Sequence, residues 1–330
     1  MINQGIFHSK FVRRDPENSK IDISVFIPVY NGALSLPELI QRIDVVLQKT
    51  NYVYEYVLVD DGSSDDSWNI ISSLHQSRDN MCAFRHLRNM GYNFTLQHGL
   101  EYCTGEWVLT LDDDLQHLPE EIPKLLSVAE KDPDIDVVFG AFVQRQHKMW
   151  RNIGSTLYLK MIRTLYGLPK DLFITSFRLI NRRVVDQVVH SNLAEPQAGF
   201  MILKATRRIK NVSVKHGERK YGESGIRISK MIKLTFDLLL HHTTLPLQLI
   251  TGIGVTAFFT SLVLSFYYLS TYYIYQSSVS GFTTLVLLIL AFGGLTLFSI
   301  GIVGFYVSRL LRQVTFTPVY SVRDFLEPKT

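Results

Sequence analysis

Three consecutive carboxylates, Asp112, Asp113 and Asp114, follow an apolar run that begins at Trp107, and the amide of Gln116 comes two residues later. A short apolar run bounded by acidic residues is typical of a buried strand. Oxygen ligands at the spacing Asp-x-Asp-x-Gln suit Mg²⁺ or Mn²⁺, cations that in turn bind diphosphates. We predict a metal site in which Asp114 is the strongest ligand, joined by Asp112 and Gln116, and we assign no role to Asp113. A solvated acidic loop is the alternative.

Two earlier strand ends carry a similar pattern. One apolar run ends at Asp60 and Asp61, and another passes through Pro28 to a turn at Asn31. In open α/β sheets, ligands bind beyond the carboxyl ends of the strands. These turns are therefore predicted to share one edge of a sheet with the acidic run.

The elements that would position these turns alternate along the first half of the chain. Such alternation predicts a parallel, doubly wound sheet. We expect strands at 23–28, 54–60, 82–87, 107–112 and 136–139, and helices at 36–49, 67–75, 93–102 and 119–130. Further strands are possible at 177–180 and 212–215, and an amphipathic helix is expected at 149–166.

The C-terminal third differs sharply from the rest, because no Asp, Glu, Lys or Arg occurs from Leu238 to Ser308. Its segments 245–270 and 282–307 are each long enough for the ~20 residues of a membrane-spanning helix. We predict a transmembrane hairpin, with a buried helical pair in a soluble core as the alternative.

Basic residues flank this hairpin and are missing from its connecting loop. Lys230 and Lys233 precede the first span, and Arg309 and Arg312 follow the second, which predicts that both termini are cytoplasmic. Residues 226–243 mix apolar and basic positions at helical spacing, as an interfacial helix would. The basic excess around this segment favours anionic lipid over nucleic acid as its partner. The basic tail 1–20 has no apolar core, so no cleavable signal peptide is expected, and the two cysteines are expected to be core thiols.

A glycine-containing basic loop, 216–224, lies just ahead of the interfacial segment. Arg219 offers bidentate contacts to phosphate, and Gly222 would let the backbone approach it. A basic surface loop with a turn glycine is the alternative.

At its three strand-end motifs the chain resembles the family 2 nucleotide-sugar glycosyltransferases, whose fold is called GT-A. The resemblance spans roughly residues 23 to 224 and implies an Mg²⁺ or Mn²⁺ cofactor at Asp112-x-Asp114. It also implies a nucleotide site, whose residues would be Pro28, Tyr30, Asn31, Asp60, Asp61, Arg88, Asn89 and Asp112.

Further motifs resemble the polyprenyl-phosphate branch of this family. Asp-x-Asp-x-Gln is similar to that of dolichyl-phosphate mannose synthase, and His-x-x-Arg-x-x-Gly-x-Ser to that of bactoprenol glucosyltransferases and undecaprenyl-phosphate aminoarabinose transferases. The second motif implies an acceptor-phosphate site made of His216, Arg219, Gly222 and Ser224.

Two positions depart from the family pattern. Tyr92 stands where a basic or amide residue commonly follows the Arg-Asn-x-Gly turn. The stretch Thr175-Ser176-Phe177-Arg178 resembles the family's Thr-Ser-Gly-Phe-Arg with the Gly missing, or its Gly-Asp-Phe-Arg variant with Ser176 in the Asp position. The missing Asp could alter donor choice or weaken the enzyme. We expect Arg178 to pair with a substrate phosphate, with a structural ion pair as an equal alternative.

These observations predict an inverting, metal-dependent transferase that moves a sugar from a nucleotide to a polyprenyl phosphate, undecaprenyl or dolichyl, at the cytoplasmic membrane face. The catalytic residues would be Asp112, Asp114, Arg178 and Arg219. The expected organisation is a basic tail (1–20), a GT-A domain (21–225), a juxtamembrane helix (226–243), the hairpin (244–308) and a cytoplasmic tail (309–330), with a homo-oligomer possible. A processive polysaccharide synthase is one alternative, although the chain lacks Gln-x-x-Arg-Trp, and a degenerate membrane-anchored nucleotide-binding protein is the other.

Overall fold

The computed structural model describes residues 21–142, 172–191, 197–217, 281–315 and 321–329, with scattered positions between 247 and 274. The chain divides into two compact units. One contains the sheet and its helices together with 317–330, and the other contains 150–165 and 225–316. The expected helix at 149–166 and the interfacial segment 226–243 lie outside the described residues.

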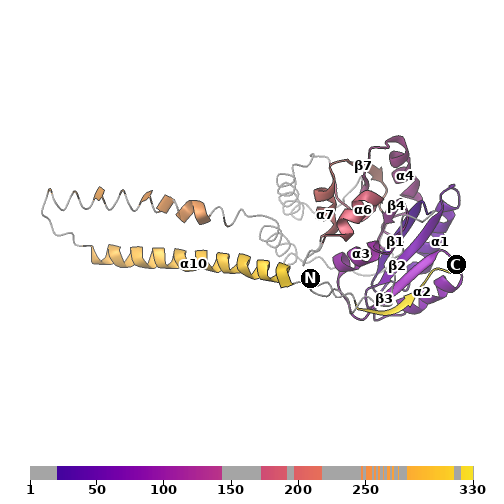
Figure 1. Ribbon diagram of the computed structural model, residues 1–330, viewed down its shortest axis with the longest axis horizontal. Helices are drawn as coiled ribbons and strands as arrows, with labels where there is room; N and C mark the ends of the chain where they lie inside the picture. The colour runs from indigo at the N-terminus through magenta and orange to yellow at the C-terminus, as the bar shows by residue number, and fades with distance from the viewer. Residues whose placement is uncertain are drawn as a thin grey trace, which may run out of the picture. The chain divides into compact units, whose positions relative to one another are not determined.

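An eight-stranded mixed sheet forms the first unit (Figure 1), in the order β7-β5-β6-β4-β1-β2-β3-β8. Its strands are β1 (Ile23–Val29), β2 (Tyr54–Asp60), β3 (Met81–His86), β4 (Trp107–Thr110), β5 (Val137–Phe142), β6 (Arg178–Asn181), β7 (Ile209–Val214) and β8 (Val322–Leu326). The expected parallel core is present in β4-β1-β2-β3. The sheet is nevertheless mixed, because β6 runs antiparallel to both β4 and β5, and β8 runs antiparallel to β3.

Helices cover both faces of the sheet, which explains why β1 and β2 are almost continuously apolar. The helices are α1 (Leu36–Leu47), α2 (Ser67–Gln76), α3 (Tyr92–Leu100), α4 (Ile122–Lys131), α6 (Arg182–Val189) and α7 (Ala198–Ala205). Buried residues of α1, α2 and α4 join one core cluster, and those of α3, α6 and α7 join the other. The helix expected at 119–130 is divided into a 3₁₀ turn, Pro119–Glu121, and α4, and each begins at or next to a proline.

The strand register brings the predicted turns together. Val29 of β1 pairs with Asp60 of β2, and Phe26 pairs with Thr110 of β4. The three strands therefore end near one another, and the turns that follow them meet at the same edge of the sheet.

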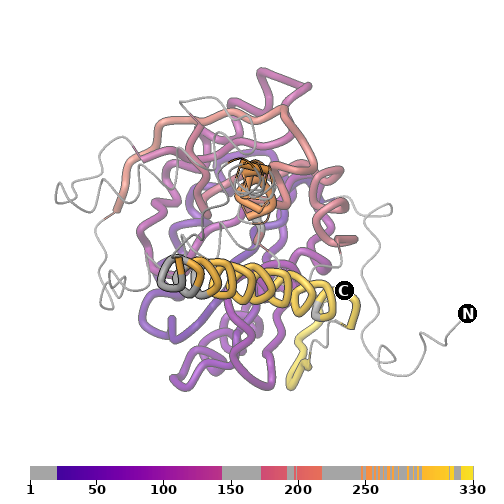
Figure 2. Tube along the Cα trace, turned by 90° about the vertical axis from the view of Figure 1, so that its left-hand side faces the viewer, coloured from indigo at the N-terminus to yellow at the C-terminus, as the bar shows by residue number. Residues whose placement is uncertain are grey.

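The C-terminal residues return to the sheet after the apolar segment. β8 pairs with the edge strand β3, with Phe325 opposite Phe84, and lies beside it in Figures 1 and 2. The backbone N–H of Leu87 also donates to the carbonyl of Ser321. The residues that follow the apolar segment in sequence thus form an edge strand of the sheet.

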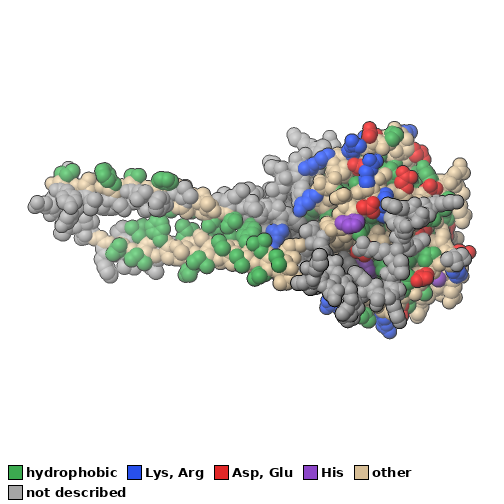
Figure 3. Space-filling view, in the orientation of Figure 1, with side chains coloured by type: hydrophobic (Ala, Val, Ile, Leu, Met, Phe, Trp, Pro, Cys, Tyr) green, Lys and Arg blue, Asp and Glu red, His purple; other side chains and the backbone are tan. Residues whose placement is uncertain are grey.

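The second unit contains α10 (Phe282–Thr315). Among the described residues, one helical stretch, Phe292–Thr315, is long and apolar enough to cross a membrane. The described positions of 247–274 are helical, and Gly254 and Ala257 face Leu295 and Ser299 of α10 across a cavity of about 570 Å³. Hydrophobic side chains cover this unit, whereas charged ones gather on the sheet unit (Figure 3). The two-span hairpin stays a prediction.

Candidate active site

The acidic turn after β4 has an unusual backbone. Leu115 adopts a left-handed conformation with φ of 61°, which costs free energy for a bulky L-residue and is found most often at functional sites. The side chain of Asp114 stabilises the turn, because its Oδ1 accepts a hydrogen bond of 3.1 Å from the backbone N–H of Gln116. Two of the predicted metal ligands thus belong to one ordered turn.

Asp112 is held asymmetrically. Its Oδ2 accepts a hydrogen bond of 2.6 Å from the Ser176 hydroxyl, and its backbone N–H donates to Nδ1 of His117. Its Oδ1 is buried without a hydrogen-bond partner among the residues that the structure describes. A buried, unpaired carboxylate oxygen is costly unless something else pairs with it, so Asp112 fits the metal-ligand role that the sequence predicts.

His117 was not predicted as a site residue. Its ring lies between Phe142 and Phe177, with centroids 5.6 and 5.4 Å away. Burial lowers its pKa, so the imidazole is neutral. Because Nδ1 accepts from Asp112, the proton is on Nε2, which lies 3.4 Å from the Ser176 hydroxyl. No sequence pattern distinguishes this histidine from a solvated one after an acidic run.

Asp113 links the acidic turn to the turn after β1. Its Oδ2 accepts a hydrogen bond of 3.2 Å from the backbone N–H of Tyr30, and it occupies the space where a Cβ on Gly32 would lie. Burial, together with the neighbouring Asp112 and Asp114, raises the pKa of Asp113 to about 7. This carboxylate therefore connects two of the predicted binding turns.

Asn31 joins the turn after β1 to the turn after β2. Its φ of 55° is left-handed, a conformation that Asn tolerates better than most residues. Its Oδ1 accepts from the backbone N–H of Ser64 at 2.9 Å, and its own N–H donates to the Ser63 hydroxyl. Asn31 thus positions the predicted nucleotide-binding turns, whatever else it contacts.

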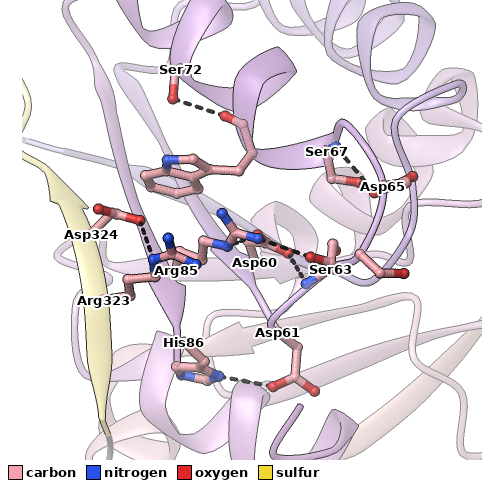
Figure 4. Close-up of polar contacts among 12 residues, drawn as sticks. Asp60, Asp61, Ser63, Asp65, Ser67, Ser72, Arg85, His86, Arg323 and Asp324 are labelled. Carbon is pink, nitrogen blue, oxygen red and sulfur yellow. Dashed lines mark hydrogen bonds and ion pairs between the residues drawn. The ribbon is translucent and has the colours of Figure 1, made fainter. Parts of the chain in front are cut away.

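Asp60 is fully buried and paired within the protein (Figure 4). Its Oδ1 accepts from the backbone N–H of Ser63. Its Oδ2 forms an ion pair with Nε of Arg85 at 3.1 Å, but it is buried with no hydrogen-bond partner among the residues that the structure describes. Burial raises the pKa of Asp60, while Ser63 and Arg85 act against that rise. The base or ribose contact predicted for Asp60 would have to share a carboxylate that already has protein partners.

Asp61 organises the turn after β3. It accepts hydrogen bonds of 2.8 Å from the backbone N–H groups of Met90 and Gly91, and its Oδ1 lies 2.9 Å from Nδ1 of His86 (Figure 4). Burial acts to raise the pKa of Asp61, but these hydrogen bonds outweigh it and lower the pKa. The turn after β3 also lies very close to Gly62, because a Cβ added to Gly62 would be 2.7 Å from the carbonyl carbon of Arg88. The structure therefore places Arg88 and Asn89 beside the turn after β2.

Arg178 and Tyr92 approach the acidic turn from two further elements. Nε of Arg178 donates to the Thr110 hydroxyl at 3.2 Å, and one terminal nitrogen, Nη2, is buried with no hydrogen-bond partner in the described part of the chain. The Tyr92 hydroxyl contacts Asp112 and Ser176. Its pKa is raised to about 12, mainly by burial, with Arg178 acting to lower it and Asp112 to raise it.

The predicted acceptor-phosphate loop begins at the acidic turn. His216 pairs with His117 in an isolated antiparallel bridge, and the backbone N–H of Gly217 donates to the carbonyl of Gln116 at 2.9 Å. The other predicted acceptor residues, Arg219, Gly222 and Ser224, lie outside the described residues.

The described residues contain no group of three or more His, Cys, Asp or Glu side chains arranged as a metal site. Asp112, Asp114 and Gln116 nevertheless lie in one turn, beside Arg178 and the start of the acceptor loop. Tyr30 and Asn31 lie in the neighbouring turn, and Pro28 lies in β1 just before it. The predicted residues within the described ranges therefore belong to adjoining turns along one sheet edge.

A comparison with known proteins decides the family. The family model "Glycosyl transferase family 2" matches residues 24–189, which include β1 to β6 and the acidic turn. The chain belongs to glycosyl transferase family 2. It is 30% identical over 311 residues, 93% of this chain and 94% of the relative, to an undecaprenyl-phosphate 4-deoxy-4-formamido-L-arabinose transferase of Yersinia enterocolitica.

Solved structures support the GT-A-like α/β fold of this family 2 member. Mannosyl-3-phosphoglycerate synthase from Rubrobacter xylanophilus matches with a TM-score of 0.51 at 15% identity, covering 67% of this chain and 75% of the other. Glucosyl-3-phosphoglycerate synthase from Mycobacterium tuberculosis, in complex with Mn²⁺, uridine diphosphate and phosphoglyceric acid, matches with a TM-score of 0.50 at 16% identity, covering 67% and 77%.

Proposed function

We propose that this family 2 glycosyltransferase moves a sugar from a nucleotide donor to a polyprenyl phosphate at the cytoplasmic face of a membrane, with inversion at the anomeric carbon. The observation that carries the proposal is the contact between the acidic turn and the start of the acceptor loop, at Gln116 and Gly217. The nucleotide-sugar donor and the lipid-phosphate acceptor would then bind to two segments that contact each other.

The donor would occupy the turns after β1, β2 and β4. Asp112, Asp114 and Gln116 would hold a divalent cation, which supplies positive charge to the departing diphosphate. The glucosyl-3-phosphoglycerate synthase matched above was crystallised with Mn²⁺ and uridine diphosphate, which supports this kind of cofactor and donor.

The acceptor would be a lipid phosphate, as the name of the Yersinia relative suggests. A phosphate monoester is largely ionised near neutral pH, so its attack requires no strong general base. Arg219 would hold this phosphate, and the unpartnered Nη2 of Arg178 is available to a second phosphate oxygen. Direct displacement by one nucleophile inverts the reacting centre.

Membrane attachment would be through the apolar segment of the second unit. The chain leaves the sheet unit before this segment and returns to it at β8. Both ends of the segment therefore connect to the same folded domain, which favours an even number of spans. An uncharged hairpin with basic flanks satisfies this requirement.

Purified full-length protein incubated with a panel of UDP- and GDP-sugars, and with undecaprenyl or dolichyl phosphate, tests the proposal. We expect metal-dependent sugar transfer to at least one lipid phosphate. Release of free sugar alone, or elongation of a polysaccharide, would contradict it, and nucleotide binding without turnover would indicate a degenerate enzyme.

A further inference from the structure

Two hydroxyl groups from separate elements converge on one carboxylate of the acidic turn. Ser176, just before β6, donates a hydrogen bond of 2.6 Å to Oδ2 of Asp112. Tyr92, the first residue of α3, contacts both Asp112 and Ser176 through its hydroxyl. Although 41% of the Tyr92 surface is exposed, this hydroxyl end is buried.

The backbone around Ser176 is itself fixed. The Thr110 hydroxyl donates to the Ser176 carbonyl at 2.6 Å, and Thr110 also accepts from Nε of Arg178. Nε2 of His117 lies 3.4 Å from the Ser176 hydroxyl on another side. The Ser176 oxygen can therefore accept from His117 while its proton is donated to Asp112.

The result is a carboxylate with two unequal oxygens. Oδ2 of Asp112 accepts a hydrogen bond from the Ser176 hydroxyl, whereas Oδ1 is buried and has no hydrogen-bond partner in the described ranges. Hydrogen bonds to one oxygen hold the carboxylate in a single orientation, as outer-shell partners of metal ligands commonly do.

The negative charge of the acidic turn favours neutral side chains at positions 92 and 176. Asp112, Asp113 and Asp114 already place three carboxylates in one turn. A further carboxylate at position 176, beside Asp112, would add repulsion, whereas a hydroxyl donor stabilises the ionised form. Ser176 and Tyr92 are the two departures from the family pattern, and the hydroxyl groups of both lie beside the Asp112 carboxylate.

We propose that Tyr92 and Ser176 are positioning residues that hold the Asp112 carboxylate, so that Oδ1 is presented to a divalent cation. This inference rests on the proposed function for the cation itself. Tyr92 and Ser176, the two positions that depart from the family pattern, would then both support metal binding, and their presence would not mean a weakened enzyme.

The test measures Mn²⁺ binding to the full-length protein, without substrates, by electron paramagnetic resonance of the free ion. Tyr92→Phe and Ser176→Ala each remove one hydroxyl, and we expect each to weaken Mn²⁺ binding by about 10-fold or more. Ser176→Thr keeps a hydroxyl and should restore binding to within about threefold of the unaltered protein. Tyr52→Phe is a matched control, because its hydroxyl contacts Glu130 outside the site.

Thermal unfolding of each variant shows whether it is folded. Unchanged Mn²⁺ affinity in folded Tyr92→Phe and Ser176→Ala would overturn the inference, as would equal weakening by Tyr52→Phe. If Ser176→Ala does not fold, Tyr92→Phe and Ser176→Thr still decide the result. Failure of the unaltered protein to bind Mn²⁺ would instead contradict the cation in the proposed function, so the two failures are distinguishable.

Discussion

Gly217 is hydrogen-bonded to Gln116 through its backbone, and the two residues come from segments a hundred positions apart. The approach is close, because a Cβ on Gly217 would lie 2.6 Å from the carbonyl oxygen of Leu115. Leu115 is the residue held in the left-handed conformation. The geometry of the acidic turn and the position of the acceptor loop are therefore coupled.

Replacing Gly217 with Ala should disturb this coupling. The added methyl group must displace either the Leu115 turn or the loop, and misplacement of about 1 Å can cost roughly 100-fold in rate. We expect sugar transfer to fall by about 10- to 100-fold while the protein remains folded. Gly252→Ala, where an added Cβ meets nothing within 4 Å, is the control. Equal activity of the two variants would argue against the coupling.

Replacing Asp114 with Ala should abolish transfer with little effect on folding, since this carboxylate belongs to the turn and not to the apolar core. We expect a loss of at least about 100-fold in kcat, and the same loss on adding a chelator to the unaltered protein. Asp134→Ala removes an exposed carboxylate that precedes β5 and pairs with Arg208, and it should have no effect on transfer. Full activity in excess chelator would contradict the metal assignment.

Replacing Arg219 with Ala should weaken use of the lipid phosphate more than use of the nucleotide donor. Loss of a charge-assisted contact should cost about 1.5 to 3 kcal/mol, or roughly tenfold or more in kcat/KM for the acceptor. Arg219→Lys should recover little if the contact is bidentate. Separate titrations of donor and acceptor measure this. A defect confined to the donor would place Arg219 at the diphosphate.

Replacing Asp61 with Asn should lower the stability of the folded protein at pH 7 by about 1 to 3 kcal/mol. The folded state lowers the pKa of Asp61 below its usual 3.8, so the ionised carboxylate stabilises the fold above that pH. This stabilisation is lost as the pH falls through the folded-state pKa. Denaturant unfolding at pH 7 and pH 3 should therefore show a smaller difference between Asp61→Asn and the unaltered protein at pH 3. A difference that does not change with pH would contradict this account, and exposed Asp134→Asn serves as the control.

A topology reporter at Ser277 should be found outside the cytoplasm, while reporters at Lys10 and Lys329 should be inside. The expectation depends on the basic flanks of the uncharged segment and on the return of the chain to the sheet. Protease protection or cysteine labelling from each side measures it. Opposite locations for the two terminal reporters would require an odd number of spans.

The parallel core was predictable because each of its strands is an apolar run ending at a polar turn, as at Asp60. Residue type and spacing predicted the metal turn, and family resemblance added the nucleotide-site residues along the same sheet edge. Strand β8 was not predictable, because two of the five residues in Val-Arg-Asp-Phe-Leu are charged and its partner β3 lies some 240 residues earlier. Local periodicity carries no signal for such a distant pairing.

The strand-end carboxylates of the candidate site could be picked out from the sequence, whereas the contacts that support them could not. Carboxylates at strand ends indicate chemistry by their type and spacing, as Asp112 and Asp114 do. The His117 ring is held near Ser176 because it packs between Phe142 and Phe177. The carboxylate of Asp113 accepts a hydrogen bond from the backbone N–H of Tyr30. These contacts join residues from separate strands, so they depend on tertiary packing that no local pattern encodes.

The position of β8 also sets the order of events during synthesis. The edge strand β3 must wait for residues 322–326, which the ribosome completes only after the entire apolar segment has been made. Until then, the backbone groups along one side of β3 have no strand to pair with. A chain that stopped within or just after α10 would keep every strand-end carboxylate and still lack the strand that closes this edge. The sheet can therefore be completed only after the whole apolar segment has been synthesised.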